Sequence, residues 1–273
     1  MQPTIAMCNI FDQDAEKLAK FAVTHGFSAI DWSIDPSLPE EEFLSLMQSL
    51  AGFQVRYHCR FHGVDVAYTD QRGDDSLTLL LRTVDQVAHA GGCHMTVHCG
   101  LGNPTGEGIE LARAIDNLSI LVAHGRANGV AVALENLTTP LTNNPPLFRR
   151  MVLESDAYVT IDIGHAHAVG ELLSYDGICR DYVLPHRERI LNAHIYHTEL
   201  DGYGHVPPDC LADVRGRLQL LELAESCDWW VIELMKPAEI LHTRTLLQSH
   251  LASLSLPPVA ALPENPSPLA TYS

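Results

Sequence analysis

Six acidic or imidazole side chains recur along the chain at intervals of 27 to 40 residues, each at or near the end of a predicted buried strand. They are His58, His98, Glu135, Asp162, His194 and Glu233. Three carboxylates gathered in a medium of low dielectric constant repel one another strongly, and a divalent cation relieves that repulsion. These residue types therefore predict a metal centre.

The segment VTIDIGHAHAVG, residues 159–170, shows the pattern most clearly. An apolar run typical of a buried strand ends in Asp162, followed by Gly164, His165 and His167. Burying an unpaired charge is costly, so this carboxylate and these imidazoles require a salt bridge, a metal or a substrate as partner. A single acid at a strand end caps a helix or pairs with Arg about as often as it binds metal. The six residues together favour the metal.

Glu135, Asp162, His194 and Glu233 form a set of three oxygen ligands and one nitrogen ligand, which suits Mn²⁺, Mg²⁺, Co²⁺ or Zn²⁺. Cys59 and Cys99 directly follow His58 and His98, but adjacent residues of a strand face opposite ways. We therefore expect both cysteines to lie outside the site.

The elements that must position these residues alternate between apolar runs and amphipathic stretches. Eight strands are predicted, at residues 4–10, 27–34, 53–59, 94–99, 130–136, 157–163, 190–196 and 229–234. Eight strand–helix units predict an α/β fold, a single (β/α)₈ TIM barrel over residues 1–254, with active-site residues at the C-terminal ends of the strands. Residues 255–273 are rich in proline and are expected to form a short flexible tail.

Composition excludes several classes of partner. The 273 residues include 17 Lys and Arg against 34 Asp and Glu, a formal net charge of −17, which argues against nucleic-acid and membrane-surface binding. The seven cysteines contain no C-x-x-C pair, and the N-terminus has no basic, apolar leader. We expect a cytoplasmic protein acting on a small molecule, with homo-oligomer formation left open.

The ordered segments GFSAIDW, YHCRF, VHCG, LENL, IDIGHA, AHIYH, GYGH and VIEL resemble the xylose isomerase-like TIM-barrel superfamily. That superfamily includes sugar isomerases and epimerases, inosose dehydratases and the endonuclease IV group. The resemblance implies that Glu135, Asp162, His194 and Glu233 hold one divalent metal, that Glu135 and Glu233 also act as the catalytic acid/base pair, and that His165 faces the substrate.

The endonuclease IV group adds histidines that correspond to His58 and His98 and pairs the histidine after the Asp with an Asp-x-His motif. This chain keeps His58, His98, His165 and His205, which we assign to substrate binding, but Tyr203 stands two residues before His205. His197 also stands where the superfamily often has Asp. A third metal is therefore not expected, whereas a second near His58 and His98 stays open.

Two enzyme classes fit this pattern. The preferred one is an isomerase or epimerase of a sugar, sugar phosphate or polyol, in which Glu135 and Glu233 move a proton beside a metal-bound carbonyl. The alternative is a multi-zinc hydrolase of a small phosphodiester, which the extra histidines favour. A metal-stabilised scaffold is disfavoured, because a structural site needs four ligands and this one offers more.

Overall fold

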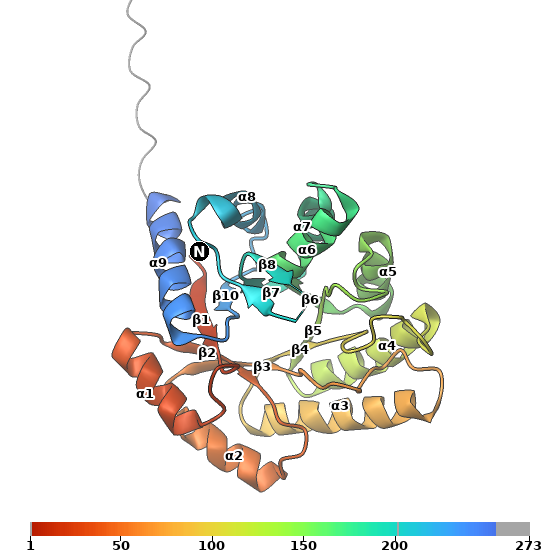
Figure 1. Ribbon diagram of the computed structural model, residues 1–273. Coiled ribbons are helices and arrows are strands. Elements are labelled where there is room, and N and C mark those ends of the chain that lie inside the picture. Colours follow the sequence, from red (N-terminus) through yellow and green to blue (C-terminus); the bar gives the residue numbers. More distant parts are fainter. Residues whose placement is uncertain (1, 201, 255–273) are drawn as a thin grey trace, which may run out of the picture.

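The computed structural model describes residues 2–200 and 202–254, which form a closed parallel barrel surrounded by helices (Figure 1). The hydrogen-bonded strand order is β1-β10-β7-β6-β5-β4-β3-β2. The barrel strands are β1 (Thr4–Cys8), β2 (Ala29–Ser33), β3 (Gln54–His58), β4 (His94–Val97), β5 (Ala131–Glu135), β6 (Tyr158–Asp162), β7 (Ile190–Ile195) and β10 (Trp229–Ile232). The predicted (β/α)₈ barrel is thus confirmed.

Helices connect successive strands on the outside of the barrel. They are α1 (Ala15–His25), α2 (Glu40–Gln48), α3 (Gln71–His89), α4 (Leu111–Ala127), α5 (Pro145–Ser155), α6 (Ile163–Leu173), α7 (Ile178–His186), α8 (Ala212–Leu221) and α9 (Pro237–Leu254). In the described part of the chain, no helix is long and apolar enough to cross a membrane. The proposed boundary at 254 and the proline-rich tail, residues 255–273, remain predictions, since the tail lies outside the described residues.

A small antiparallel hairpin lies between β7 and α8 in the sequence and was not predicted. It consists of β8 (Thr198–Leu200) and β9 (Gly204–Val206), and it places Glu199 directly opposite His205. The hairpin packs against α6, so it lies over the side of the barrel where β6 and β7 end.

Two apolar clusters hold the fold together. The larger one fills the space between the strands and the helices, and the smaller one joins Ala6, Cys8, Ala29, Trp229 and Val231 from β1, β2 and β10. Because alternate residues of a strand face opposite sides, the smaller cluster lies inside the barrel. Toward the C-terminal ends of the strands, the buried side chains are polar. These ends form the candidate site.

Candidate metal centre

The C-terminal ends of the barrel strands bring the six predicted residues together. His58, Glu135 and Asp162 are the last residues of β3, β5 and β6, and His194 is next to last in β7. All six side chains belong to residues that are at most 7% exposed. Asp162 also begins α6, because its Oδ1 accepts a hydrogen bond of 2.7 Å from the His165 backbone N–H. The turn that starts the helix therefore fixes this carboxylate.

Glu135, Asp162, His194 and Glu233 form a first cluster, in which one ligand atom of each lies within 4.8 Å of the others. His194 Nδ1 lies 3.1 Å from Glu135 Oε1, 3.0 Å from Glu233 Oε2 and 3.8 Å from Asp162 Oδ2. The structure thus gathers the four residues around a common centre, while their role as metal ligands stays a prediction.

The charge state of this cluster shows how tightly the groups interact. Burial acts to lower the pKa of His194, but the carboxylates of Glu135 and Glu233 outweigh it and the pKa is raised well above its usual value. Burial raises the pKa of Asp162 to about 6. Three buried carboxylates around one imidazolium keep an excess of negative charge, which is the donor chemistry that a divalent cation fits.

His58, His98 and Glu135 form a second cluster that shares Glu135 with the first. Nε2 of His58 and Nε2 of His98 lie 3.0 Å apart, and Glu135 Oε2 lies 3.2 Å from the former and 3.0 Å from the latter. These separations are close to the edges of a zinc tetrahedron, about 3.3 Å for bonds of about 2.0–2.1 Å.

The second nitrogen of His98 indicates which atom is available to a metal. His98 Nδ1 lies 2.9 Å from the Cys59 carbonyl oxygen, which can only accept, so Nδ1 carries the proton. In the neutral ring Nε2 then presents a lone pair toward a carboxylate oxygen, a contact that a cation between them would relieve. Metal-ligating histidines commonly donate their other N–H to such a carbonyl.

A third cluster contains His165, His205 and Glu199. His165 Nε2 lies 3.2 Å from Glu199 Oε2, while His165 Nδ1 and His205 Nδ1 donate to the carbonyl oxygens of Asn136 (3.0 Å) and Glu233 (2.8 Å). Both imidazoles again direct Nε2 away from a backbone carbonyl. The endonuclease IV group has an Asp at the position of Tyr203, which this chain lacks. Glu199, on the strand that pairs with His205, supplies a carboxylate instead. The expectation that no third metal binds here stays a prediction.

The remaining candidates lie outside these clusters. His167 contacts Glu171, and His197 Nδ1 accepts from Arg217. Cys99 Sγ donates to Asp65. These contacts give none of the three a place among the candidate ligands. Four histidines were assigned to substrate binding, and these roles stay predictions. The side chains of all four are mostly buried: His58, His98, His165 and His205.

Two charged residues of the centre were not identified from the sequence. Asp31, on β2, is completely buried beside His58, and Glu199 belongs to the unpredicted hairpin. Asp31 carried a signal in the sequence, because it is a carboxylate within the otherwise apolar strand FSAIDWSI. The sequence around Glu199 gave no such signal, since no local pattern there predicts a strand that pairs with His205.

A closed parallel barrel with buried acid–imidazole clusters at the C-terminal ends of its strands defines a TIM barrel whose clustered donors are consistent with divalent-metal binding. The chain belongs to the xylose isomerase-like TIM barrel family, whose sequence model matches residues 19–248. The predicted resemblance is thus confirmed.

Comparison with individual proteins gives both a sequence relative and structural neighbours. The uncharacterized protein MJ0008 of Methanocaldococcus jannaschii is 30% identical over 177 residues, which cover 65% of this chain and 74% of the relative. The structure is similar to 3-keto-D-glucoside 4-epimerase from E. coli (TM-score 0.69, 17% identity, 91% of this chain and 100% of that one). It is also similar to an L-ribulose 3-epimerase (TM-score 0.70, 15% identity, 92% and 95%). Similarity at this identity establishes the fold alone.

Proposed function

We propose that this chain is a divalent-metal-dependent hydrolase of a small phosphodiester. The observation that carries the proposal is the division of one carboxylate between two clusters: Glu135 Oε1 faces His194, and Glu135 Oε2 faces His58 and His98. A carboxylate placed in this way suits two cations bound side by side. When bound, such a pair supplies an activated water and neutralises the charge of a phosphoryl group.

The histidines of the second cluster favour the hydrolase over the isomerase. An isomerase that uses one metal is complete with Glu135, Asp162, His194 and Glu233, and it gives no reason for two further imidazoles to converge on Glu135. Those imidazoles are buried and aim Nε2 at its second oxygen. The geometry therefore favours the alternative that the sequence left in second place.

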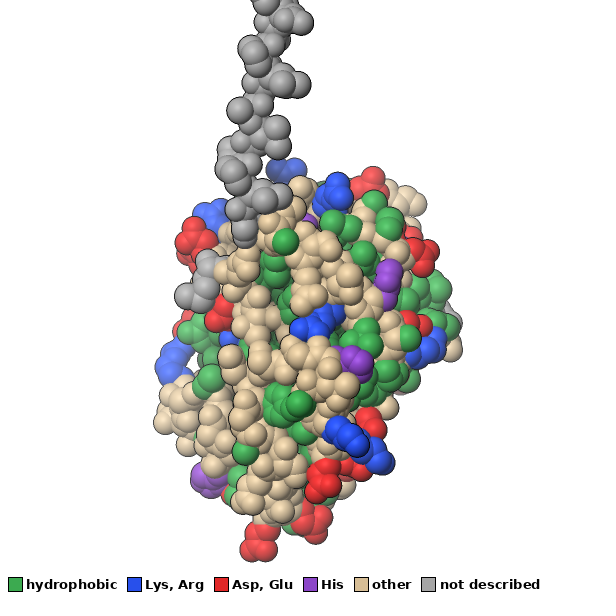
Figure 2. Space-filling view, turned by 90° about the vertical axis from the view of Figure 1, so that its left-hand side faces the viewer, with side chains coloured by type: hydrophobic (Ala, Val, Ile, Leu, Met, Phe, Trp, Pro, Cys, Tyr) green, Lys and Arg blue, Asp and Glu red, His purple; other side chains and the backbone are tan. Residues whose placement is uncertain are grey.

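The surroundings of the centre fit a small anionic substrate. Arg60 Nη1 lies 3.9 Å from Glu233 Oε1, and its side chain is 32% exposed. A groove of about 540 Å³ beside Arg60 is also lined by His62, Trp32 and one carboxylate, that of Asp35. On the face that Figure 2 shows, Lys and Arg side chains are scattered and form no continuous basic area. Together with the net charge of −17, this favours a small substrate over a nucleic acid.

A sugar isomerase or epimerase is the second candidate, and a specific observation favours it. Glu135 and Glu233 both approach His194 Nδ1, at 3.1 and 3.0 Å, so two buried carboxylates flank one position, as an acid/base pair requires. The solved structures named above, which share this fold, are themselves sugar epimerases.

One preparation, loaded separately with Zn²⁺, Mn²⁺, Co²⁺ or Mg²⁺, distinguishes the candidates. We expect metal-dependent hydrolysis of bis(p-nitrophenyl) phosphate and no exchange of solvent deuterium into a panel of ketoses. Deuterium incorporation into a ketose without hydrolysis would establish the second candidate instead. Glu135→Gln should abolish either activity, which ties the measured reaction to this centre.

A further inference from the structure

Asp31 is a buried carboxylate without an obvious charge partner. It lies on β2 and is 0% exposed. Among the described residues it forms no ion pair with Lys or Arg, and its one ion-pair contact is with His58. Because a buried carboxylate without a partner is costly, its position next to the metal centre calls for an explanation.

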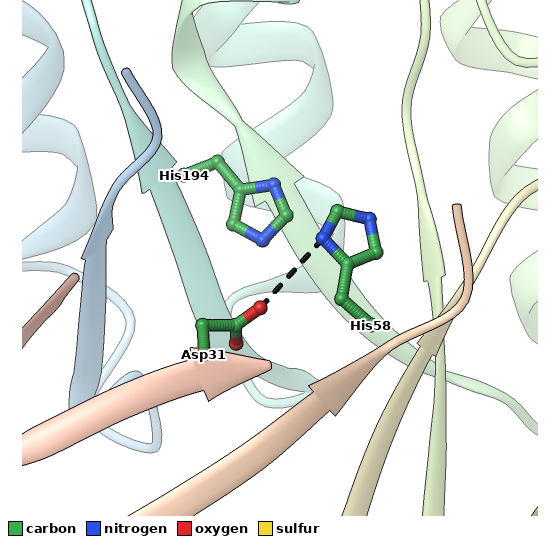
Figure 3. A group of neighbouring side chains, drawn as sticks. All are labelled: Asp31, His58 and His194. Carbon is green, nitrogen blue, oxygen red and sulfur yellow. Dashed lines mark ion pairs between the residues drawn. The ribbon is translucent and has the colours of Figure 1, made fainter. Parts of the chain in front are cut away.

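The carboxylate of Asp31 lies between two imidazoles that belong to different clusters. Its Oδ1 is 3.6 Å from His58 Nδ1, and its Oδ2 accepts a hydrogen bond of 3.4 Å from Asn192 Nδ2. Figure 3 shows the rings of His58 and His194 next to each other, each with one nitrogen turned toward Asp31. One ligand atom of each of these three residues lies within 4.8 Å of the others.

Each of these two imidazoles directs one nitrogen into its cluster, and its other nitrogen faces Asp31. His58 directs Nε2 at Glu135 and His98, so Nδ1 is left, and His194 directs Nδ1 at Glu135 and Glu233, so Nε2 is left. His194 Nε2 and Asp31 Oδ1 are both buried and make no hydrogen bond within the described chain. A neutral imidazole that offers one lone pair to a cation carries a proton on its other nitrogen, and that N–H needs an acceptor.

The other carboxylate near His58 Nδ1 is more distant. Glu233 Oε1 lies 3.8 Å from His58 Nδ1, farther than Asp31, and Arg60 approaches the same oxygen. His98, His165 and His205 each have a backbone carbonyl as acceptor. His58 has a carboxylate in that place. An imidazole whose N–H faces a carboxylate is a stronger metal ligand than one whose N–H faces a carbonyl.

We infer that Asp31 is a positioning residue of the metal centre that serves both clusters: when metal binds, its carboxylate becomes the acceptor of the Nδ1–H of His58, now 3.6 Å away, and of the Nε2–H of His194, now beyond ion-pair distance. It holds one ligand of each cluster in the tautomer that presents a lone pair to the metal. The inference rests on the two-cluster centre of the proposed function, but not on the reaction that the centre catalyses.

Metal affinity in the full-length protein tests this role. We expect Asp31→Asn to weaken binding of Zn²⁺ at both clusters by about 10–100-fold, measured by competition with a chelator, because an amide accepts less strongly and carries no charge. The matched control is Asp65→Asn, since Asp65 is also buried but accepts from backbone N–H groups of Ala67 and Gly100. The control should lower the melting temperature and leave the affinity for Zn²⁺ unchanged.

A second measurement reports the tautomers directly. In ¹⁵N-histidine-labelled protein with Zn²⁺ bound, two-bond ¹H–¹⁵N spectra should show a proton on Nδ1 of His58 and on Nε2 of His194, and Asp31→Asn should change at least one of these patterns. Asp31→Glu, which keeps the charge but shifts the carboxylate, should weaken binding in the same direction and serves if the Asn variant does not fold.

Three results would overturn the inference. They are an Asp31→Asn protein that binds Zn²⁺ with wild-type affinity, a loss of affinity matched by Asp65→Asn, and removal of one whole equivalent with the other unaffected, which would make Asp31 a direct ligand. A wild-type protein that binds two metal ions but hydrolyses no phosphodiester would refute the proposed reaction and leave this test intact.

Discussion

Replacing His58 and His98 together by Gln tests whether the second cluster holds a metal. The change removes two of its three candidate ligands and leaves Glu135 Oε2 alone at that position. A four-ligand zinc site contributes on the order of 10–16 kcal/mol, or about 2.5–4 kcal/mol per ligand if the ligands contribute equally. Losing two ligands should therefore weaken binding by about 6 kcal/mol, roughly 10⁴-fold.

The measurement is the metal content per chain after dialysis against a weak chelator, for wild type and the double variant. We expect the total to fall by one equivalent, because the first cluster keeps Glu135, Asp162, His194 and Glu233. Phosphodiester hydrolysis should fall to background in the double variant. The control is His89→Gln with His167→Gln, which removes two imidazoles from outside the clusters and the groove.

The outcome that refutes the argument is an unchanged metal content together with unchanged hydrolysis. His58 and His98 would then act only as hydrogen-bonding neighbours of Glu135, and the single-metal isomerase would become the better assignment. Loss of metal from the control variant would show instead that histidine content alone, and not the cluster, determines binding.

Three further predictions concern the scaffold. A Cβ added at Gly164 would lie 2.1 Å from the Tyr196 ring, so Gly164→Ala should destabilise the protein by about 1–3 kcal/mol, measured by urea unfolding. The control is Gly216→Ala on α8, where a Cβ meets open space; it should be neutral or stabilising by up to about 1 kcal/mol. Burial lowers the pKa of His186 to about 4 from 6.5, so the unfolded chain binds the proton more tightly, and the free energy of unfolding should fall as the pH drops from about 6.5 to 4, by about 3 kcal/mol at most. Urea titrations of wild type and His186→Leu over that range check this, and equal slopes for the two proteins would contradict it. Deleting residues 255–273 should leave the melting temperature nearly unchanged, an expectation that rests on composition alone, and a drop of many degrees would contradict it.

The barrel could be predicted because its strands are marked by local patterns. The strand predicted at 157–163 is observed as Tyr158–Asp162, and the one at 190–196 as Ile190–Ile195. Buried parallel strands are short continuous apolar runs, and helices between them show spacings of three and four, so both are visible in a single sequence. The strand predicted at 94–99 ends earlier, at Val97, because the chain leaves the ladder before His98.

The parts of the site that escaped prediction depend on contacts between distant residues. Glu199 meets His165 only because a hairpin folds over the end of β6, and its partner in the hairpin, His205, is fixed by strand pairing. Asp31 was visible as an acid in a strand, but its relation to His58 and His194 follows from closure of the barrel. Local patterns specify which residues reach the strand ends, whereas the grouping into clusters follows from the register of the whole barrel.

The sequence left open whether the acid at the end of β6 pairs with a cationic side chain, a metal or a substrate. Among the described residues, neither Glu135 nor Asp162 forms an ion pair with Lys or Arg, and Glu233 approaches only Arg60, at 3.9 Å. Ordinary salt bridges therefore do not balance these buried carboxylates. The histidines offer the remaining positive charge: without a metal, Glu135 and Glu233 raise the pKa of His194 well above its usual value, and Asp162 and Glu199 raise the pKa of His165 to about 10. Bound cations that replace these protons would balance the carboxylates and leave neutral imidazoles as ligands, so they account for both sets of residues at once.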